Sequence, residues 1–126
     1  ETDSAKLMTA GLELAEQTFE TFLKTQFGND REQIQRAVSH QVGEAHRKSL
    51  FDRLGLLTDL EFSIFSEFGN TGSSALPMAL NLAQSNKNIS PWVDGERAAL
   101  FGIGSGLSCT MMKLKWKEIP RCWTEK

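Results

Sequence analysis

Cysteine is scarce in this chain and neither sign of charge dominates it. Of 126 residues only Cys109 and Cys122 are cysteine, too few and too irregularly placed for a disulfide scaffold or a zinc site, so reduced thiols are expected. Lysine and arginine number 14 against 16 aspartate and glutamate residues, which argues against a nucleic-acid partner. No apolar run approaches the roughly 18 residues of a membrane span, and residues 1–4 lack the features of a signal peptide. These absences predict a cytoplasmic protein.

What is present is the composition of one globular domain. Hydrophobic residues make up 40% of the chain and charged residues 24%, without an internal repeat or a low-complexity stretch. The first residue is Glu1 rather than methionine, and a helical pattern begins almost at once. We therefore expect the chain to be a piece of something longer.

Three segments are predicted to be helical. In residues 7–27 the apolar side chains recur every three or four residues, Asp3 or Ser4 is placed to cap the start, and Gly28 follows as a stop. Residues 43–54 carry apolar side chains on one side, with Gly55 as the stop. Residues 73–84 are rich in Ala, Leu and Met, and Pro77 falls early enough to be tolerated.

Four segments are predicted to be strands. They are residues 34–40, residues 60–68, the apolar run 98–101, and residues 107–116, whose alternation breaks locally at Met112. The resulting order is α-β-α-β-α-β-β, which predicts an α/β fold: a mostly parallel sheet with an antiparallel edge hairpin.

Ligands of such sheets collect at the carboxyl ends of the strands, where His40, Asn70 and the Gly104-Ser105-Gly106 loop are expected. Each has an ordinary structural interpretation: a hydrogen-bonded histidine, an Asn in a turn between glycines, and a tight hairpin. Together they suit acyl chemistry, because an imidazole N–H and a carboxamide N–H can both donate to a thioester oxygen that becomes an enolate. A nucleophilic Cys at a helix N-terminus would also be needed, and neither Cys109 nor Cys122 fits.

Three motifs resemble one family. Ser39-His40-Gln41-Val42, then Glu67-Phe68-Gly69-Asn70-Thr71-Gly72 followed by Ser73-Ser74-Ala75-Leu76-Pro77, and Leu100-Phe101-Gly102-Ile103-Gly104-Ser105-Gly106-Leu107 occur in that order. They are similar to the C-terminal half of a 3-oxoacyl-[acyl-carrier-protein] synthase III, of the thiolase fold. The resemblance runs from about the first predicted helix to Trp116. It implies that residues 1–126 form a half-domain without its first strand and without the whole N-terminal half.

The resemblance also implies roles. His40 and Asn70 would be two members of a Cys-His-Asn site, the Cys coming from the missing half, and the backbone N–H of Ser105 would help to form the oxyanion hole. The implied enzyme is a homodimer that needs no metal or other cofactor and takes acyl-CoA or acyl carrier protein as substrate.

Departures from the family pattern bear on the substrate. After His40-Gln41 the carrier-protein-dependent enzymes usually have Ala-Asn and then Arg two residues later, where this chain has Val42-Gly43 and then Ala45. Arg47 and Lys48 could substitute, as a contact for a CoA phosphate or for a carrier protein. Residues 102–109 are similar to the corresponding loop of the family branch that condenses two long-chain acyl-CoAs in olefin and ketone synthesis. Acyl-CoA is therefore the expected acyl donor.

Two other functions stay open. The chain could belong to an enzyme that transfers or hydrolyses acyl groups without condensing them. It could also be a noncatalytic half-domain that completes a fold or a dimer, because it holds no fitting nucleophile.

Overall fold

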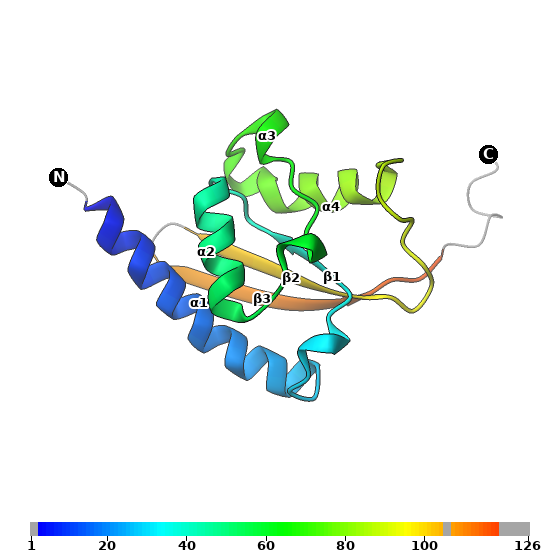
Figure 1. The fold of residues 1–126 in the computed structure, drawn as a ribbon, viewed down its shortest axis with the longest axis horizontal. Coiled ribbons are helices and arrows are strands. Elements are labelled where there is room, and N and C mark those ends of the chain that lie inside the picture. The colour runs from blue at the N-terminus through cyan, green and yellow to red at the C-terminus, as the bar shows by residue number, and fades with distance from the viewer. Residues whose placement is uncertain (1–2, 105–106, 119–126) are drawn as a thin grey trace.

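A computed structural model describes residues 3–104 and 107–118 of the chain (Figure 1). Its main elements in chain order are α1 (Ser4–Gln26), β1 (Arg36–Ser39), α2 (Glu44–Leu54), α3 (Phe65–Phe68), α4 (Ala75–Ser85), β2 (Arg97–Gly104) and β3 (Ser108–Lys115). Single 3₁₀ turns occupy Arg31–Gln33, Thr58–Leu60 and Gly72–Ser74. The strands form one sheet in the order β1-β2-β3, in which β1 and β2 are parallel and β2 and β3 antiparallel. The expected parallel pair with an antiparallel edge hairpin is therefore present.

The helix boundaries follow the signals in the sequence. The Asp3 side chain accepts a hydrogen bond from the Lys6 backbone N–H at 3.2 Å and so caps α1, satisfying one of the free donors at that end. Gly55 adopts a left-handed conformation with φ of 67°, which ends α2. Pro77 is the third residue of α4, where a missing backbone N–H removes no intrahelical hydrogen bond.

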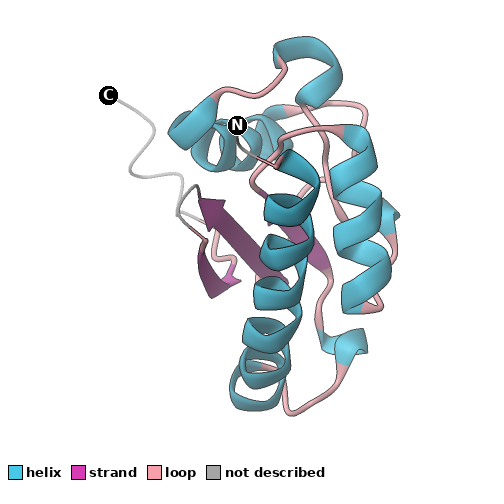
Figure 2. Cartoon of the chain, turned by 90° about the vertical axis from the view of Figure 1, so that its left-hand side faces the viewer, coloured by secondary structure: helices cyan, strands magenta, loops and turns pink. Residues whose placement is uncertain are grey.

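The two faces of the sheet are covered by different helices. Helices α1 and α2 lie side by side over one face, and α4 covers the other (Figures 1 and 2). Because successive strand residues point to opposite faces, Ala99 and Phe101 face α1 and α2, whereas Ala98 and Leu100 face α4. The alanines let the helices approach the sheet closely.

Phe101 is the centre of the larger core. Its fully buried ring meets the rings of Phe19, Phe22 and Phe51 edge-on, with centroid distances of 6.0, 6.4 and 6.3 Å. These rings come from β2, α1 and α2, so one aromatic cluster joins both helices to the sheet.

The predicted strand at residues 60–68 is wrong. Of these residues only Glu61 bridges to β1, opposite Ala37, and residues 65–68 are the short helix α3. Side chains bind the backbone groups that a strand ladder would have paired: Glu61 accepts from the Ser39 N–H, and Gln41 accepts from the Ile64 N–H and donates to the Phe62 carbonyl. The alternation in this segment therefore reflects a half-buried loop held by polar side chains.

The other strands differ from prediction only in extent. Strand β1 is shorter than the predicted 34–40, and β2 continues through Gly102 to Gly104 where a loop was expected. The irregularity at Met112 is not a bulge, because Met111 pairs with Phe101 and Met112 with Leu100 without a skipped residue. The apolar pattern instead changes faces: Met111 packs toward the α1 side and Leu114 toward the α4 side.

Candidate active site

One open cleft of about 900 Å³ collects three of the predicted positions. His40, which directly follows β1, Asn70, which precedes α4, and Gly104, the last residue of β2, all line it. The carboxyl ends of the parallel strands β1 and β2 meet at this edge, and the start of α1 forms another wall. The three positions thus line one cleft although they lie 30 and more residues apart. Asn70 does not follow a strand, as was expected, but the short helix α3.

His40 is held by β2. Its backbone N–H donates to the Phe101 carbonyl at 2.9 Å, continuing the β1-β2 ladder by one residue. Partial burial lowers the pKa of the imidazole below its usual value, because desolvation disfavours the cation. Near neutral pH the ring is therefore uncharged, with one nitrogen as a hydrogen-bond donor.

His46 of α2 lines the same cleft, although no motif in the sequence indicated it. Burial lowers the pKa of His46, and the nearby His40 lowers it further, since two imidazolium ions would repel each other. The available sequence signal is that the chain has only two histidines and that they lie six residues apart, His46 being in the first turn of the helix that follows His40. Because each imidazole disfavours a positive charge on the other, the proximity of His46 favours the neutral form of both histidines.

Asn70 sits in a loop whose backbone depends on glycine. Gly69 and Gly72 adopt φ values of 65° and 63°, a region that side chains with a Cβ rarely enter. The Asn70 Oδ1 accepts a hydrogen bond from the Gly72 N–H at 2.9 Å, which leaves the Nδ2 hydrogens as the donors of this carboxamide. The structural interpretation of Asn70 as a turn residue and its proposed donor role are thus compatible.

Arg47 and Lys48 have different surroundings. The Arg47 guanidinium is largely enclosed and contacts Glu61 at 2.6 Å, Glu44 at 2.7 Å and the Thr58 carbonyl at 2.9 Å. Burial opposes its charge, but the hydrogen bonds and charges of Glu61 and Glu44 outweigh burial and raise the pKa of Arg47. Lys48 is exposed on the same helix. Arg47 is therefore committed to contacts within the chain, and Lys48 is the freer of the two for a substrate phosphate.

The glycine loop is described only in part. Ser105, predicted to supply an oxyanion-hole N–H, lies outside the described residues, whereas the flanking Gly104 and Ser108 pair with each other and line the cleft. A Cβ on Gly104 would come within 2.8 Å of the Ser108 Oγ. A side chain at position 104 would therefore require the Ser108 hydroxyl to rotate away.

Cys109 is not a nucleophile of this cleft. It lies in β3, packs against the α1 side of the core, and has a thiol pKa raised by burial. Cys122 lies outside the described residues.

The described parts of the chain show neither a metal-binding cluster nor a membrane-spanning helix. In residues 3–104 and 107–118 no group of three His, Cys, Asp or Glu side chains is arranged to hold a metal ion. Within the same ranges no helix combines the length and the apolar character needed to cross a membrane.

Comparison with known proteins identifies relatives that are named as two kinds of enzyme. An acyl-CoA:acyl-CoA alkyltransferase of Shewanella oneidensis is 36% identical over 115 residues, which are 91% of this chain and 32% of that protein. A beta-ketoacyl-[acyl-carrier-protein] synthase III of Oceanobacillus iheyensis is 31% identical over 91 residues, 72% of this chain and 28% of that protein. The chain thus spans about a third of the length of the relatives it matches.

Solved structures agree with the sequence matches. A crystal structure of Xanthomonas campestris OleA superposes with a TM-score of 0.80 at 33% identity, covering 91% of this chain and 32% of that one. A 3-oxoacyl-(acyl carrier protein) synthase III from Xanthomonas oryzae gives a TM-score of 0.79 at 32% identity, covering 91% of this chain and 33% of that one.

The architecture is the C-terminal half of a thiolase fold, as the sequence motifs implied. The chain belongs to the 3-oxoacyl-[acyl-carrier-protein] synthase III C-terminal family, whose model matches residues 25–116. The resemblance found in the sequence is thereby confirmed.

Proposed function

We propose that this chain is the half of a condensing enzyme that carries His40 and Asn70, and that the whole enzyme joins two acyl thioesters through a carbon–carbon bond. The observation that carries the proposal is that His40 and Asn70, which come from separate loops, line one cleft as two neutral hydrogen-bond donors. Donors of this kind stabilise an oxyanion that forms during the reaction and do not require a buried net charge.

The proposed reaction has three steps. A Cys thiolate from the N-terminal half attacks the first acyl thioester, and the thiol of its carrier leaves. The second thioester either loses its α-carboxylate as carbon dioxide or gives up an α-proton, which passes through a base of the N-terminal half to the carrier sulfur released in the first step. The enolate oxygen accepts hydrogen bonds from His40 and Asn70. The enolate carbon then attacks the acyl-Cys carbonyl, the C–S bond breaks, and a 3-oxoacyl thioester and free Cys remain. These groups and the thioesters suffice, so the proposal includes no metal or organic cofactor.

The cleft walls support an acyl substrate. Leu7, Met8, Val42 and Leu107 are large apolar side chains that line the cleft and are each at least about a third exposed. An apolar wall beside two polar donors suits a thioester with a hydrocarbon chain. The other half would cover part of this wall. We also propose that the whole enzyme is a cytoplasmic homodimer, with the N–H of Ser105 as a third oxyanion donor.

The test uses the protein together with its N-terminal half. Incubated with acyl-CoA, it should gain the mass of one acyl group on a Cys and then form a 3-oxo product, both measured by mass spectrometry. Acylation followed only by release of free fatty acid would show a hydrolase. An absence of acylation with either acyl-CoA or acyl carrier protein would show a noncatalytic half-domain.

A further inference from the structure

A buried carboxylate, Glu61, is hydrogen-bonded to the residue that precedes the proposed catalytic histidine. The Glu61 side chain is fully enclosed, and its Oε1 accepts hydrogen bonds from the backbone N–H of Ser39, at 2.8 Å, and from the Ser39 hydroxyl. Its Oε2 accepts from the Arg47 Nε at 2.6 Å. Ser39 is the residue before His40, and Arg47 lies in the helix that follows the His40 loop. Glu61 thus holds both sides of that loop.

At the edge of β1 that faces away from β2, the Glu61 side chain takes the place of a neighbouring strand. Strand β1 pairs with β2 along one edge, and at its other edge the Ser39 N–H has the Glu61 carboxylate as its partner. Since a buried carboxylate is stable only when its oxygens are paired, the positions of Ser39 and Arg47 are fixed relative to each other. Burial still raises the pKa of Glu61, against the opposing hydrogen bonds from Ser39 and Arg47.

The residue on the other side of His40 is tied to the same segment. The Gln41 Oε1 accepts from the Ile64 N–H at 2.7 Å, and its Nε2 donates to the Phe62 carbonyl at 3.1 Å. The segment of residues 61–64 continues through α3 to Gly69 and Asn70. One set of buried polar contacts therefore connects the loops that carry the two proposed donors.

We infer that Glu61 is a positioning residue: it sets the place of His40, and through residues 61–69 that of Asn70, without touching substrate. Glu61 is not among the described residues that line the cleft, so its effect must pass through Ser39 and Arg47. The inference rests on the proposed function. Small displacements of a preorganised donor are costly to the step in which charge develops, and much less so to binding.

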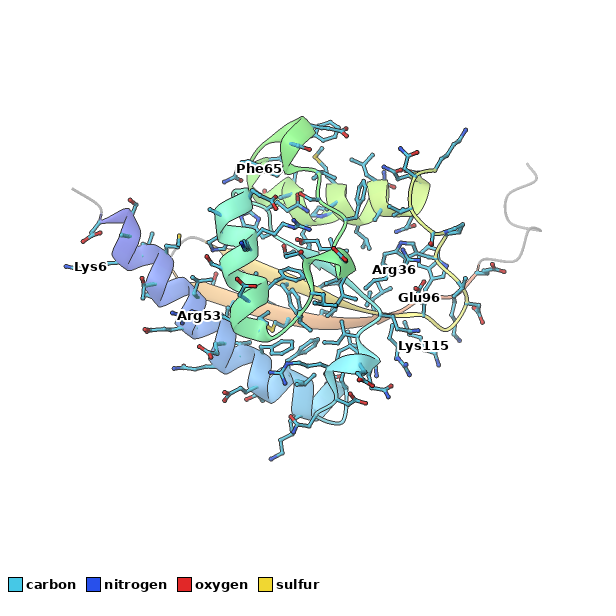
Figure 3. The ribbon with its side chains drawn as sticks, viewed as in Figure 1. Lys6, Arg36, Arg53, Phe65, Glu96 and Lys115 are labelled. Atoms are coloured by element: carbon cyan, nitrogen blue, oxygen red, sulfur yellow. The ribbon has the colours of Figure 1, made fainter. Side chains whose placement is uncertain are left out.

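A second ion pair provides a matched control. Arg36 Nε lies 2.8 Å from Glu96 Oε1, both side chains are mostly buried, and the pair joins the start of β1 to the segment before β2. Figure 3 shows Arg36 and Glu96 together at the end of the molecule away from α3, which carries the labelled Phe65. The pair stabilises the same sheet but has no contact with the His40 loop.

The experiment compares Glu61→Gln with Glu96→Gln in the protein joined to its N-terminal half. For Glu61→Gln we expect condensation of a preformed acyl-enzyme to slow about tenfold, while acylation of the Cys stays within about twofold of the parent, both measured well below the unfolding temperature. Glu96→Gln should lower the unfolding temperature without changing the ratio of the two rates. If Glu61→Gln leaves the ratio of the condensation rate to the acylation rate unchanged, whether both steps slow equally or neither slows, the inference is overturned.

Two further measurements keep the test decisive. If Glu61→Gln fails to fold, Ser39→Ala removes only one hydroxyl donor and should slow condensation selectively, but by a smaller factor. An absence of selective slowing in Ser39→Ala counts against the inference.

If the parent protein does not condense at all, the proposed function fails, and amide hydrogen exchange still tests the positioning. Exchange of the N–H groups at positions 39 and 40 should accelerate at least about tenfold in Glu61→Gln, measurably but less in Ser39→Ala where that variant replaces it, and not in Glu96→Gln. Unchanged exchange would overturn the inference independently of activity.

Discussion

The Asn70 side-chain oxygen accepts a hydrogen bond from the Gly72 N–H at 2.9 Å, so one end of the carboxamide shapes the loop and the other end is left to donate. This division lets structure and chemistry be tested separately at one residue. Asn70→Asp retains an acceptor for Gly72 but loses the donor, whereas Asn70→Ala loses both.

We expect Asn70→Asp to unfold near the temperature of the parent protein while condensation falls by about 10² to 10³ fold, the usual effect of removing an oxyanion donor. Asn70→Ala should lose activity similarly and also some stability, because the Gly72 N–H loses its partner. Thermal unfolding and condensation rates, measured on both variants, check this. Normal condensation by Asn70→Asp would mean that Asn70 is only a turn residue.

The two histidines should titrate below their ordinary range. Burial lowers the pKa of both, and His40 also lowers that of His46, so His40→Ala should move the pKa of His46 back toward 6.5. NMR of the imidazole protons against pH measures both values. A pKa of His46 that is unchanged or lower in His40→Ala would contradict the coupling.

The same shifts predict how stability depends on pH. A group whose pKa is lower in the folded than in the unfolded protein binds protons more tightly when unfolded, so the folded state loses stability as pH falls through 6.5 toward the folded pKa. Replacing both His40 and His46 by Gln should make the free energy of unfolding depend less on pH below about 6.5 than in the parent. Denaturant unfolding at several pH values provides the comparison, and an equal slope in both proteins would count against it.

Lys48 is expected to contribute to the binding of acyl-CoA. Lys48 is exposed on α2, the helix that carries the cleft residue His46, whereas Arg47 is occupied by Glu61 and Glu44. Lys48→Glu should raise KM for acyl-CoA about tenfold with little change in kcat, the loss of a charge-assisted contact. Lys115→Glu, at the far end of β3, is the control and should change neither. A similar KM for acyl-CoA in the two variants would show that Lys48 does not contribute to acyl-CoA binding.

The donor preference is a separate prediction. Ala45 stands where the carrier-dependent enzymes usually have Arg, and Arg47 is enclosed. The exposed cations left on α2 are Lys48 and Arg53, and Arg53 pairs with Glu16, which is a narrow basic surface for an acidic carrier protein. We expect condensation to be faster with acyl-CoA than with the matched acyl carrier protein. A clear preference for the carrier protein would exclude the acyl-CoA branch and leave the family unchanged.

Phe101 is expected to dominate the core that supports the cleft. Phe101→Ala removes a fully buried ring that contacts three others and should lower the free energy of unfolding by about 3–5 kcal/mol. Leu57→Ala, at a side chain 74% exposed, should change it by less than about 0.5 kcal/mol. Equal effects in urea unfolding would show that the cluster is not central.

The sequence was informative wherever the deciding interaction is local. Spacing of apolar residues and the stops at Gly28 and Gly55 gave α1 and α2 within a few residues, because a helix pairs its backbone with residues four positions away. His40 was expected at the end of a strand and does follow β1. Asn70 was expected at a strand end as well, but it follows the short helix α3, so its place in the same cleft depends on how that segment folds.

The tertiary structure decided what depends on distant partners. Residues 60–68 alternate like a strand, yet Glu61 and Gln41 supply the hydrogen bonds that a ladder would have made, and nothing local in the sequence reveals that exchange. Arg47 has the charge expected of a substrate contact, but only the fold shows Glu61 beside it. Helical periodicity is written in neighbouring residues, whereas the partner of a buried polar group is fixed by which segments meet, and those contacts exist only once the chain has folded.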